Sequence, residues 1–192
     1  MTDITIFGTG NMGSAIGAIL SAGGHSVQHV DSSTRPEAIT GEIVILAVPY
    51  AALSQIAASY GEQLAGKVVV DITNPVSFET FDDLVVPADS SAAAELAAAL
   101  PSSKVLKAFN TNLAPTLASG TVGPNKTTVL VAGDDADAKS ALIGAITSSG
   151  TVDAIDAGSL KRARELESIG FLQIALTVAE KTTWTGGFAV VR

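Results

Sequence analysis

The chain lacks cysteine altogether, and its acidic side chains outnumber its basic ones. The absence of cysteine excludes disulfides, thiolate metal ligands and cysteine nucleophiles. With 11 lysines and arginines against 19 aspartates and glutamates, the net charge is −8. Because proteins that bind nucleic acid need a basic surface, we expect no nucleic-acid partner.

Long hydrophobic runs are also missing. No stretch of about 18 apolar residues is free of a charged residue or a chain breaker, so we expect no membrane span. Asp3 stands where a secretory signal peptide would carry positive charge. Together with the absence of cysteine, these features predict a cytoplasmic protein.

Histidine is scarce, and neither His25 nor His29 stands in a pattern typical of catalysis or metal binding. A metal site would therefore consist of carboxylates alone. The acidic residues at 134, 135 and 137 are better explained as a helix N-terminus, where negative charge is favourable. We expect neither a metal site nor a catalytic acid or base.

The most informative stretch is a glycine motif near the amino terminus. The apolar segment 4–7 leads into Gly8, Gly10 and Gly13, and an apolar helical pattern follows directly. In dinucleotide-binding proteins the first of these glycines permits a sharp turn, the second admits the pyrophosphate, and the third permits close helix packing. The free N–H groups of the new helix would then face a phosphate.

Asp31 strengthens this interpretation. It ends the second apolar stretch, 18 residues after Gly13. An acidic residue about 20 residues beyond the motif binds the adenosine ribose in dinucleotide-binding folds.

Strand and helix patterns alternate along the rest of the chain. Strands are predicted at 26–30, 43–48, 68–72, 105–109, 128–132 and 152–155, and helices at 50–60, 92–100, 112–117, 135–149 and from about 159. We expect a single NAD(P)-binding domain over residues 1–192, with a helical carboxy-terminal segment from about 159. The predicted fold is α/β, a doubly wound Rossmann-type parallel sheet with helices on both faces. Between Asp31 and the strand at 43–48 there are only 11 residues, 32–42. This is too short for a full crossover with extra helix and strand, so we expect the fold to be shortened after the second strand.

Five segments in one order resemble the family of NADPH-dependent coenzyme F420 reductases and related small dinucleotide-binding oxidoreductases. They cover nearly the whole chain. The segments are 8–13 (GTGNMG), 71–75 (DITNP), 104–111 (KVLKAFNT), 131–135 (VAGDD) and 156–160 (DAGSL).

This resemblance implies a dinucleotide that lies across the carboxyl ends of the strands, which is also where ligands bind in open α/β sheets. The implied binding residues fall into three groups. Thr9, Asn11 and Met12 line the pyrophosphate turn; Ala47, Val48, Pro49 and Tyr50 flank the path from adenosine to nicotinamide; Asn74 and Pro75 lie near the nicotinamide.

The choice between NADP and NAD depends on the segment after the second strand. Relatives that select NADP carry a Ser-Arg pair where this chain has Asp31 and Ser32. A carboxylate there suits a ribose hydroxyl and therefore NAD. Ser33 and Arg35 follow, however, and offer another cradle for a 2′-phosphate. We expect NADP, with NAD as the alternative.

The resemblance implies an oxidoreductase that moves hydride between NAD(P)H and a flavin or deazaflavin carrier, with F420 or FMN as candidate substrates. Such a transfer requires proximity and orientation rather than a protein acid or base. The alternatives are a small imine or ketone reductase and a non-catalytic NAD(P) sensor. The apolar final third of the chain, and the relatives, favour a homodimer.

Two charged residues in predicted strands have open roles. Lys107 lies in an apolar segment, where it either meets an anionic substrate or covers the sheet edge with its amine in water. Asp71 ends a strand, and we expect it to stabilise the turn at Asn74 and Pro75.

Overall fold

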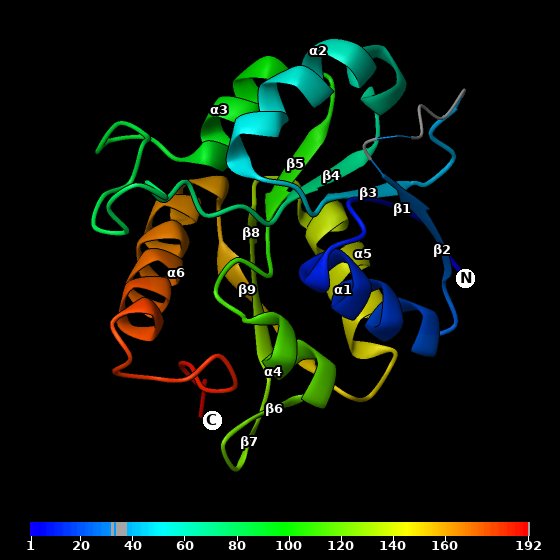
Figure 1. Cartoon of the computed structure of the whole chain (residues 1–192). Coiled ribbons are helices and arrows are strands. Elements are labelled where there is room, and N and C mark those ends of the chain that lie inside the picture. Colours follow the sequence, from blue (N-terminus) through cyan, green and yellow to red (C-terminus); the bar gives the residue numbers. More distant parts are fainter. Residues whose placement is uncertain (32, 34–37, 192) are drawn as a thin grey trace.

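A computed structural model describes residues 1–31, 33 and 38–191 of the chain. Its strands and helices alternate along the sequence, as Figure 1 shows. The strands of the main sheet are β1 (Asp3–Phe7), β2 (Ser26–Val30), β3 (Ile43–Leu46), β4 (Val68–Asp71), β5 (Lys104–Lys107), β8 (Thr128–Gly133) and β9 (Asp153–Gly158). The helices are α1 (Asn11–Ala22), α2 (Leu53–Leu64), α3 (Ala92–Ala99), α4 (Ala114–Ser119), α5 (Ala136–Thr147) and α6 (Ala163–Val178).

Smaller elements complete the described chain. The 3-10 turns η1 (Tyr50–Ala52) and η2 (Leu160–Arg162) precede α2 and α6, and β6 (Thr121–Val122) and β7 (Asn125–Lys126) form a separate hairpin. No helix among the described residues combines the length and apolar character needed to cross a membrane.

The order of strands in the main sheet places a crevice between β1 and β3. Within the described residues the order is β2-β1-β3-β4-β5-β8-β9, and β1 pairs in parallel with both β2 and β3. The chain moves from β1 outward to β2, then returns past β1 to β3 and continues the other way. Ligands of open α/β sheets bind at such a reversal point, beyond the carboxyl ends of the strands.

Helices cover both faces of the sheet, as predicted (Figure 1). One buried cluster joins side chains of β1 and β3 to α1 and α5, through residues such as Ile6, Ile16 and Leu142. A second cluster joins the other sides of β3 and β5 to α2 and α3, through residues such as Leu46 and Leu96. Strands buried on two faces consist of continuous apolar residues, which explains the four buried residues of β3.

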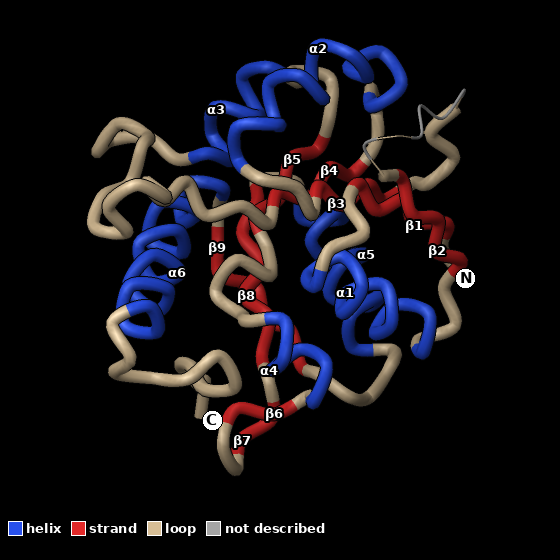
Figure 2. Tube along the Cα trace, in the orientation of Figure 1, coloured by secondary structure: helices blue, strands red, loops and turns tan. Residues whose placement is uncertain are grey.

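The sheet is mostly parallel, which confirms the predicted Rossmann-type α/β fold, and it contains one antiparallel pairing. β8 runs antiparallel to β5, and β9 is parallel to β8. Between β5 and β8 the chain contains short α4 and the β6–β7 hairpin (Figure 2). A parallel neighbour of β5 would need a long crossover that returns the chain to the end of the sheet where β5 begins. The short α4 and the hairpin do not form such a crossover, and β8 therefore pairs with β5 in the antiparallel direction.

The structure gives the bounds of two helices predicted from the sequence. The helix predicted at 50–60 is α2, which begins at Leu53 after η1 and continues to Leu64. In the carboxy-terminal segment, expected to be helical from about 159, η2 begins at Leu160 and α6 runs from Ala163 to Val178. Between β2 and β3, the described residues 31, 33 and 38–42 lie in no helix or strand.

Candidate functional site

The glycine motif forms the turn from β1 into α1, and two of its glycines are required by packing. Gly8 has a φ of +110°, and a Cβ there would lie 2.1 Å from the carbonyl oxygen of Ala47. A Cβ on Gly13 would lie 2.3 Å from the carbonyl oxygen of Gly8. Both positions therefore exclude any larger residue, independently of a ligand.

Gly10 is different, because no protein atom lies within 4 Å of the position its Cβ would take. It is the N-cap residue of α1, with φ −71° and ψ −174°, a conformation open to other residues. No side chain caps the helix, and its first turn contains no acidic residue. The open space above Gly10 therefore faces backbone N–H groups and the positive end of α1, an arrangement that suits an anion.

A cleft of about 450 Å³ opens at this turn, within the usual range of ligand sites. It lies beyond the carboxyl ends of β1, β2 and β3, against α2. Its lining residues are Phe7, Gly8, Thr9, Gly10, Val30, Asp31, Ala47, Val48, Pro49, Ala52, Gln55, Ile56, Ser59 and Tyr60.

The structure brings seven of the sequence-predicted site residues to this cleft. Asn11, Met12 and Gly13 form the first turn of α1, and Ser33 contacts Asp31. Tyr50 lines a different pocket, and Asn74 and Pro75 follow β4. Ser32 and Arg35 lie outside the described residues. The cleft residues Gln55, Ile56, Ser59 and Tyr60 escaped sequence reasoning, although their helical spacing defines one face of α2.

Asp31 enters the cleft at the end of β2. Its Oδ1 accepts a hydrogen bond from Ser33 N at 2.8 Å and another from Ser33 Oγ at 2.6 Å. These bonds orient one carboxylate oxygen toward its own chain segment, as in other aspartate turns.

The turn after β4 is held by side chains on both sides. Thr73 N donates to Asp71 Oδ1 at 2.8 Å, which confirms that Asp71 stabilises this turn. Asn74 Nδ2 donates to the Asn110 carbonyl, and Asn110 Nδ2 donates back to Asn74 Oδ1, each at 2.8 Å. Asn110 Nδ2 also donates to the carbonyl of Leu166 in α6.

Lys107 is fully buried, which makes both predicted roles for it wrong. Its Nζ donates to Asp71 Oδ2 at 2.7 Å, to Glu167 Oε1 at 2.7 Å and to the Thr73 carbonyl at 2.6 Å. Burial raises the pKa of the Glu167 carboxyl above its usual range, while the nearby Lys107 ammonium opposes that shift. Sequence reasoning did not connect Glu167 with Lys107, because the two residues lie 60 positions apart in the chain.

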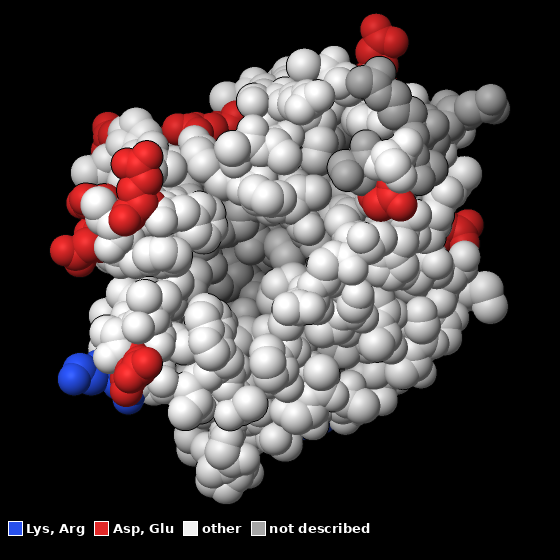
Figure 3. Space-filling model, in the orientation of Figure 1, with Lys and Arg blue, Asp and Glu red and all other residues white. Residues whose placement is uncertain are grey.

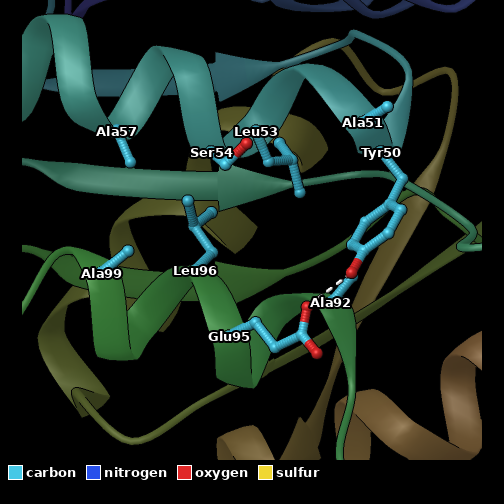
Figure 4. Close-up of a pocket in the computed structure, with 9 residues that line it drawn as sticks. All are labelled: Tyr50, Ala51, Leu53, Ser54, Ala57, Ala92, Glu95, Leu96 and Ala99. Atoms are coloured by element: carbon cyan, nitrogen blue, oxygen red, sulfur yellow. Dashed lines mark hydrogen bonds between the residues drawn. The ribbon is translucent and has the colours of Figure 1, made fainter. Parts of the chain in front are cut away.

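A second, smaller pocket of about 170 Å³ lies between α2 and α3 (Figure 4). The Tyr50 hydroxyl donates to Glu95 Oε2 at 2.5 Å across its mouth. Two effects raise the pKa of Tyr50 to about 12: the larger is partial burial of the phenol, and the smaller is the nearby Glu95 carboxylate. Its phenol therefore stays protonated at neutral pH and acts as a hydrogen-bond donor.

Charge is distributed unevenly over the face shown in Figure 3. A hollow at its centre, between α6 and α1, has uncharged walls, and the acidic side chains lie toward the periphery. Although the chain has a net charge of −8, the acidic side chains visible on this face do not line the hollow. Among the described residues, no group of three or more histidine, aspartate or glutamate side chains is arranged to hold a metal ion.

The strand order, the reversal point between β1 and β3 and the glycine turn define a protein of the Rossmann class. A family profile described as "NADP oxidoreductase coenzyme F420-dependent" matches residues 28–75. The F420-dependent NADP reductase of Methanocaldococcus jannaschii is 32% identical over 171 residues, which span 88% of this chain and 76% of the relative. The chain belongs to the family of F420-dependent NADP reductases.

Solved structures agree with this assignment. A crystal structure from Arthrobacter sp. FB24, provisionally described as an F420-dependent NADP-reductase, has a TM-score of 0.85 and 27% identity, with both chains covered completely. The imine reductase of Streptomyces aurantiacus has a TM-score of 0.62 and 17% identity, over 95% of this chain and 69% of that chain. Similarity at this lower identity reflects the shared fold.

Proposed function

We propose that the protein is an NADP-dependent oxidoreductase that transfers hydride between a nicotinamide dinucleotide and a deazaflavin or flavin carrier of the F420 type. The observation that carries the proposal is the cleft at the β1–β3 reversal point, which opens directly above Gly10. Family membership supports both the reaction class and the choice of NADP.

The dinucleotide diphosphate would bind at the N-terminus of α1, where Thr9, Gly10 and Asn11 offer backbone groups. The adenosine would lie toward Asp31, and Ala47, Val48 and Pro49 would border the middle of the ligand. The nicotinamide would lie toward Asn74 and Pro75. All three locations follow the carboxyl edge of the sheet, which supports a single extended ligand.

When bound, the nicotinamide supplies or accepts the hydride, a hydrogen with its electron pair. The chain's own residues provide orientation and exclude water, and none of them needs to exchange a proton with the ring. The uncharged walls of the central hollow suit a planar carrier ring (Figure 3). The acidic periphery would instead repel negative charge on a carrier, so any negatively charged group of the carrier would point to solvent.

Preference for NADP over NAD is proposed from the family, although Asp31 by itself suits the free ribose of NAD. Arg35 would supply the charge for the 2′-phosphate. We therefore expect Arg35→Ala to weaken NADPH binding much more than NADH binding, measured by calorimetry. An equal loss for the two nucleotides would contradict this role.

A direct activity assay tests the proposed reaction. The protein is mixed with NADPH, and the absorbance of the reduced nicotinamide is followed with F420, FMN, riboflavin or a cyclic imine as acceptor. We expect turnover with F420 or a flavin. Turnover with the imine alone would indicate an imine reductase, and tight binding without turnover would indicate a nucleotide sensor.

We further propose that residues 1–192 act as one NAD(P)-binding domain in a cytoplasmic homodimer. Exposed apolar side chains on α6 and the segment after it support self-association, among them Leu172, Trp184 and Phe188. Sedimentation analysis at several protein concentrations would test the dimer.

A further inference from the structure

Three charged side chains are buried together beside the turn that follows β4. Asp71 ends β4, Lys107 ends β5, and Glu167 belongs to α6; the exposed fraction of each side chain is at most 1%. All three N–H groups of the Lys107 ammonium have acceptors, in Asp71, Glu167 and the Thr73 carbonyl. We refer to Asp71, Lys107 and Glu167 as the buried triad.

The second carboxylate of the triad is balanced by a helix. Glu167 Oε2 accepts a hydrogen bond from Ala92 N at 3.0 Å, and its Oε1 accepts another from Ala93 N at 3.3 Å. These are the first amides of α3, where the helix carries partial positive charge. The triad therefore connects four elements, namely β4, β5, α3 and α6.

Stability alone gives little reason for this arrangement. Removing charges from water is costly, and apolar side chains of similar volume often stabilise a protein as well or better. A triad with every donor satisfied does, however, fix the relative positions of the groups it joins.

The groups fixed by the triad lead directly to Asn74. The carbonyl of Thr73 accepts from Lys107 and its N–H donates to Asp71, so both polar groups of this residue's backbone are held. The Asn74 side chain is then paired with Asn110, which also contacts α6. Gly170 of α6 fits against this pair, since a Cβ there would lie 2.3 Å from Asn74 Oδ1.

We propose that Asp71, Lys107 and Glu167 are positioning residues, which hold the Thr73–Asn74 turn at a fixed place relative to the glycine turn and thereby align the nicotinamide with its carrier. This inference rests on the proposed function. Hydride transfer depends steeply on the separation and angle of the two rings, and a displacement of about 1 Å costs as much as a hundredfold in rate. The triad acts through Asn74 and does not touch the reacting atoms.

The main test is Asp71→Asn, which keeps the size of the side chain and removes one of its two acceptor oxygens. We expect kcat with F420 or FMN to fall about tenfold to a hundredfold. The KM for NADPH and the Kd for 2′,5′-ADP, which lacks the nicotinamide, should stay within about twofold, because the glycine turn is untouched. The rate is normalised to the folded fraction, measured by circular dichroism.

Asp153→Asn is the matched control, because Asp153 pairs with Lys126 at 3.0 Å on the surface. We expect it to keep kcat, KM and Kd. If Asp71→Asn yields too little folded protein, Glu167→Gln provides the same test, since it retains the Lys107–Asp71 pair and alters the contacts that α6 makes with Lys107 and α3.

The outcomes separate the two proposals. A wild-type protein that turns over no carrier overturns the proposed function, and the triad's role with it. An active wild type whose triad variants lose thermal stability but keep kcat per folded molecule overturns the positioning role alone. A parallel loss of 2′,5′-ADP affinity would also overturn it, because the effect would then reach the whole cleft.

Discussion

The two ends of the candidate site are built by opposite means. At the glycine turn, the missing side chains of Gly8, Gly10 and Gly13 bring backbone groups to an open cleft. At the Asn74 end, the half-buried Asn74 side chain is paired with Asn110, and among the described residues Thr73 Oγ1 and Asn110 Oδ1 are the buried side-chain atoms there without a hydrogen-bond partner. The first end offers hydrogen-bonding groups to a ligand, whereas the second offers mainly a fixed shape. Binding and alignment are therefore assigned to separate parts of the chain.

The strongest test of this difference removes the centre of the Asn74 end. We expect Lys107→Met to lower the free energy of unfolding by about 3–5 kcal/mol, because two buried carboxylates lose their shared cation. Denaturant titration followed by circular dichroism measures this change.

Lys126→Met is the control for that variant, since it removes a lysine from an exposed pair. It should change the free energy of unfolding by about 1 kcal/mol or less. If the two variants lost similar amounts of unfolding free energy, the buried triad would contribute no more to stability than an exposed ion pair.

A second test addresses the glycine end. We expect Gly10→Ala to weaken NADPH and NADH binding at least about tenfold, which corresponds to about 1.4 kcal/mol, because the methyl group would occupy the path of the diphosphate. The free energy of unfolding should change by less than about 1 kcal/mol, since the Cβ meets no protein atom. Calorimetry and denaturant titration measure the two effects.

Gly144→Ala is a matched control, because its Cβ in α5 also meets no protein atom within 4 Å. It should leave nucleotide affinity unchanged. If Gly10→Ala bound both nucleotides like the wild type, the diphosphate could not lie above Gly10.

The smallest expected effect concerns Tyr50, which follows the cleft residue Pro49. Its phenol should ionise near pH 12, identified as the ultraviolet titration step that Tyr50→Phe removes. Glu95→Gln should lower this pKa only in part, because burial is the larger cause. Since the folded pKa exceeds the unfolded value of about 10, the stabilising contribution is complete below pH 10 and is lost as the pH rises toward 12. An unshifted titration would contradict the Tyr50–Glu95 hydrogen bond.

Sequence reasoning succeeded where the determinants are local. The glycine spacing, the strand before it and the helix after it predicted the turn between β1 and α1. The alternation of apolar segments predicted the layers of the fold. These features depend on neighbouring residues, so their patterns are visible in the chain itself.

Features that depend on distant partners were not predictable in this way. Lys107 looks like an edge residue until Glu167, from a helix 60 residues later, is brought beside it. The direction of β8 depends on how α4 and the β6–β7 hairpin fold, and the pairing of Asn74 with Asn110 depends on the register of β4 against β5. Each of these was fixed by tertiary packing, which single-residue preferences do not encode.

Gly170 allows α6 to pack closely against Asn74. Because a methyl group there would collide with the Asn74 amide, rotation or sliding of α6 by one residue would push a side chain against Asn74. Attempts to widen the hollow for bulkier acceptors by shifting this helix would have to redesign Asn74 at the same time. The absence of a side chain at position 170 would thus link changes in the hollow to changes at the proposed nicotinamide end of the site.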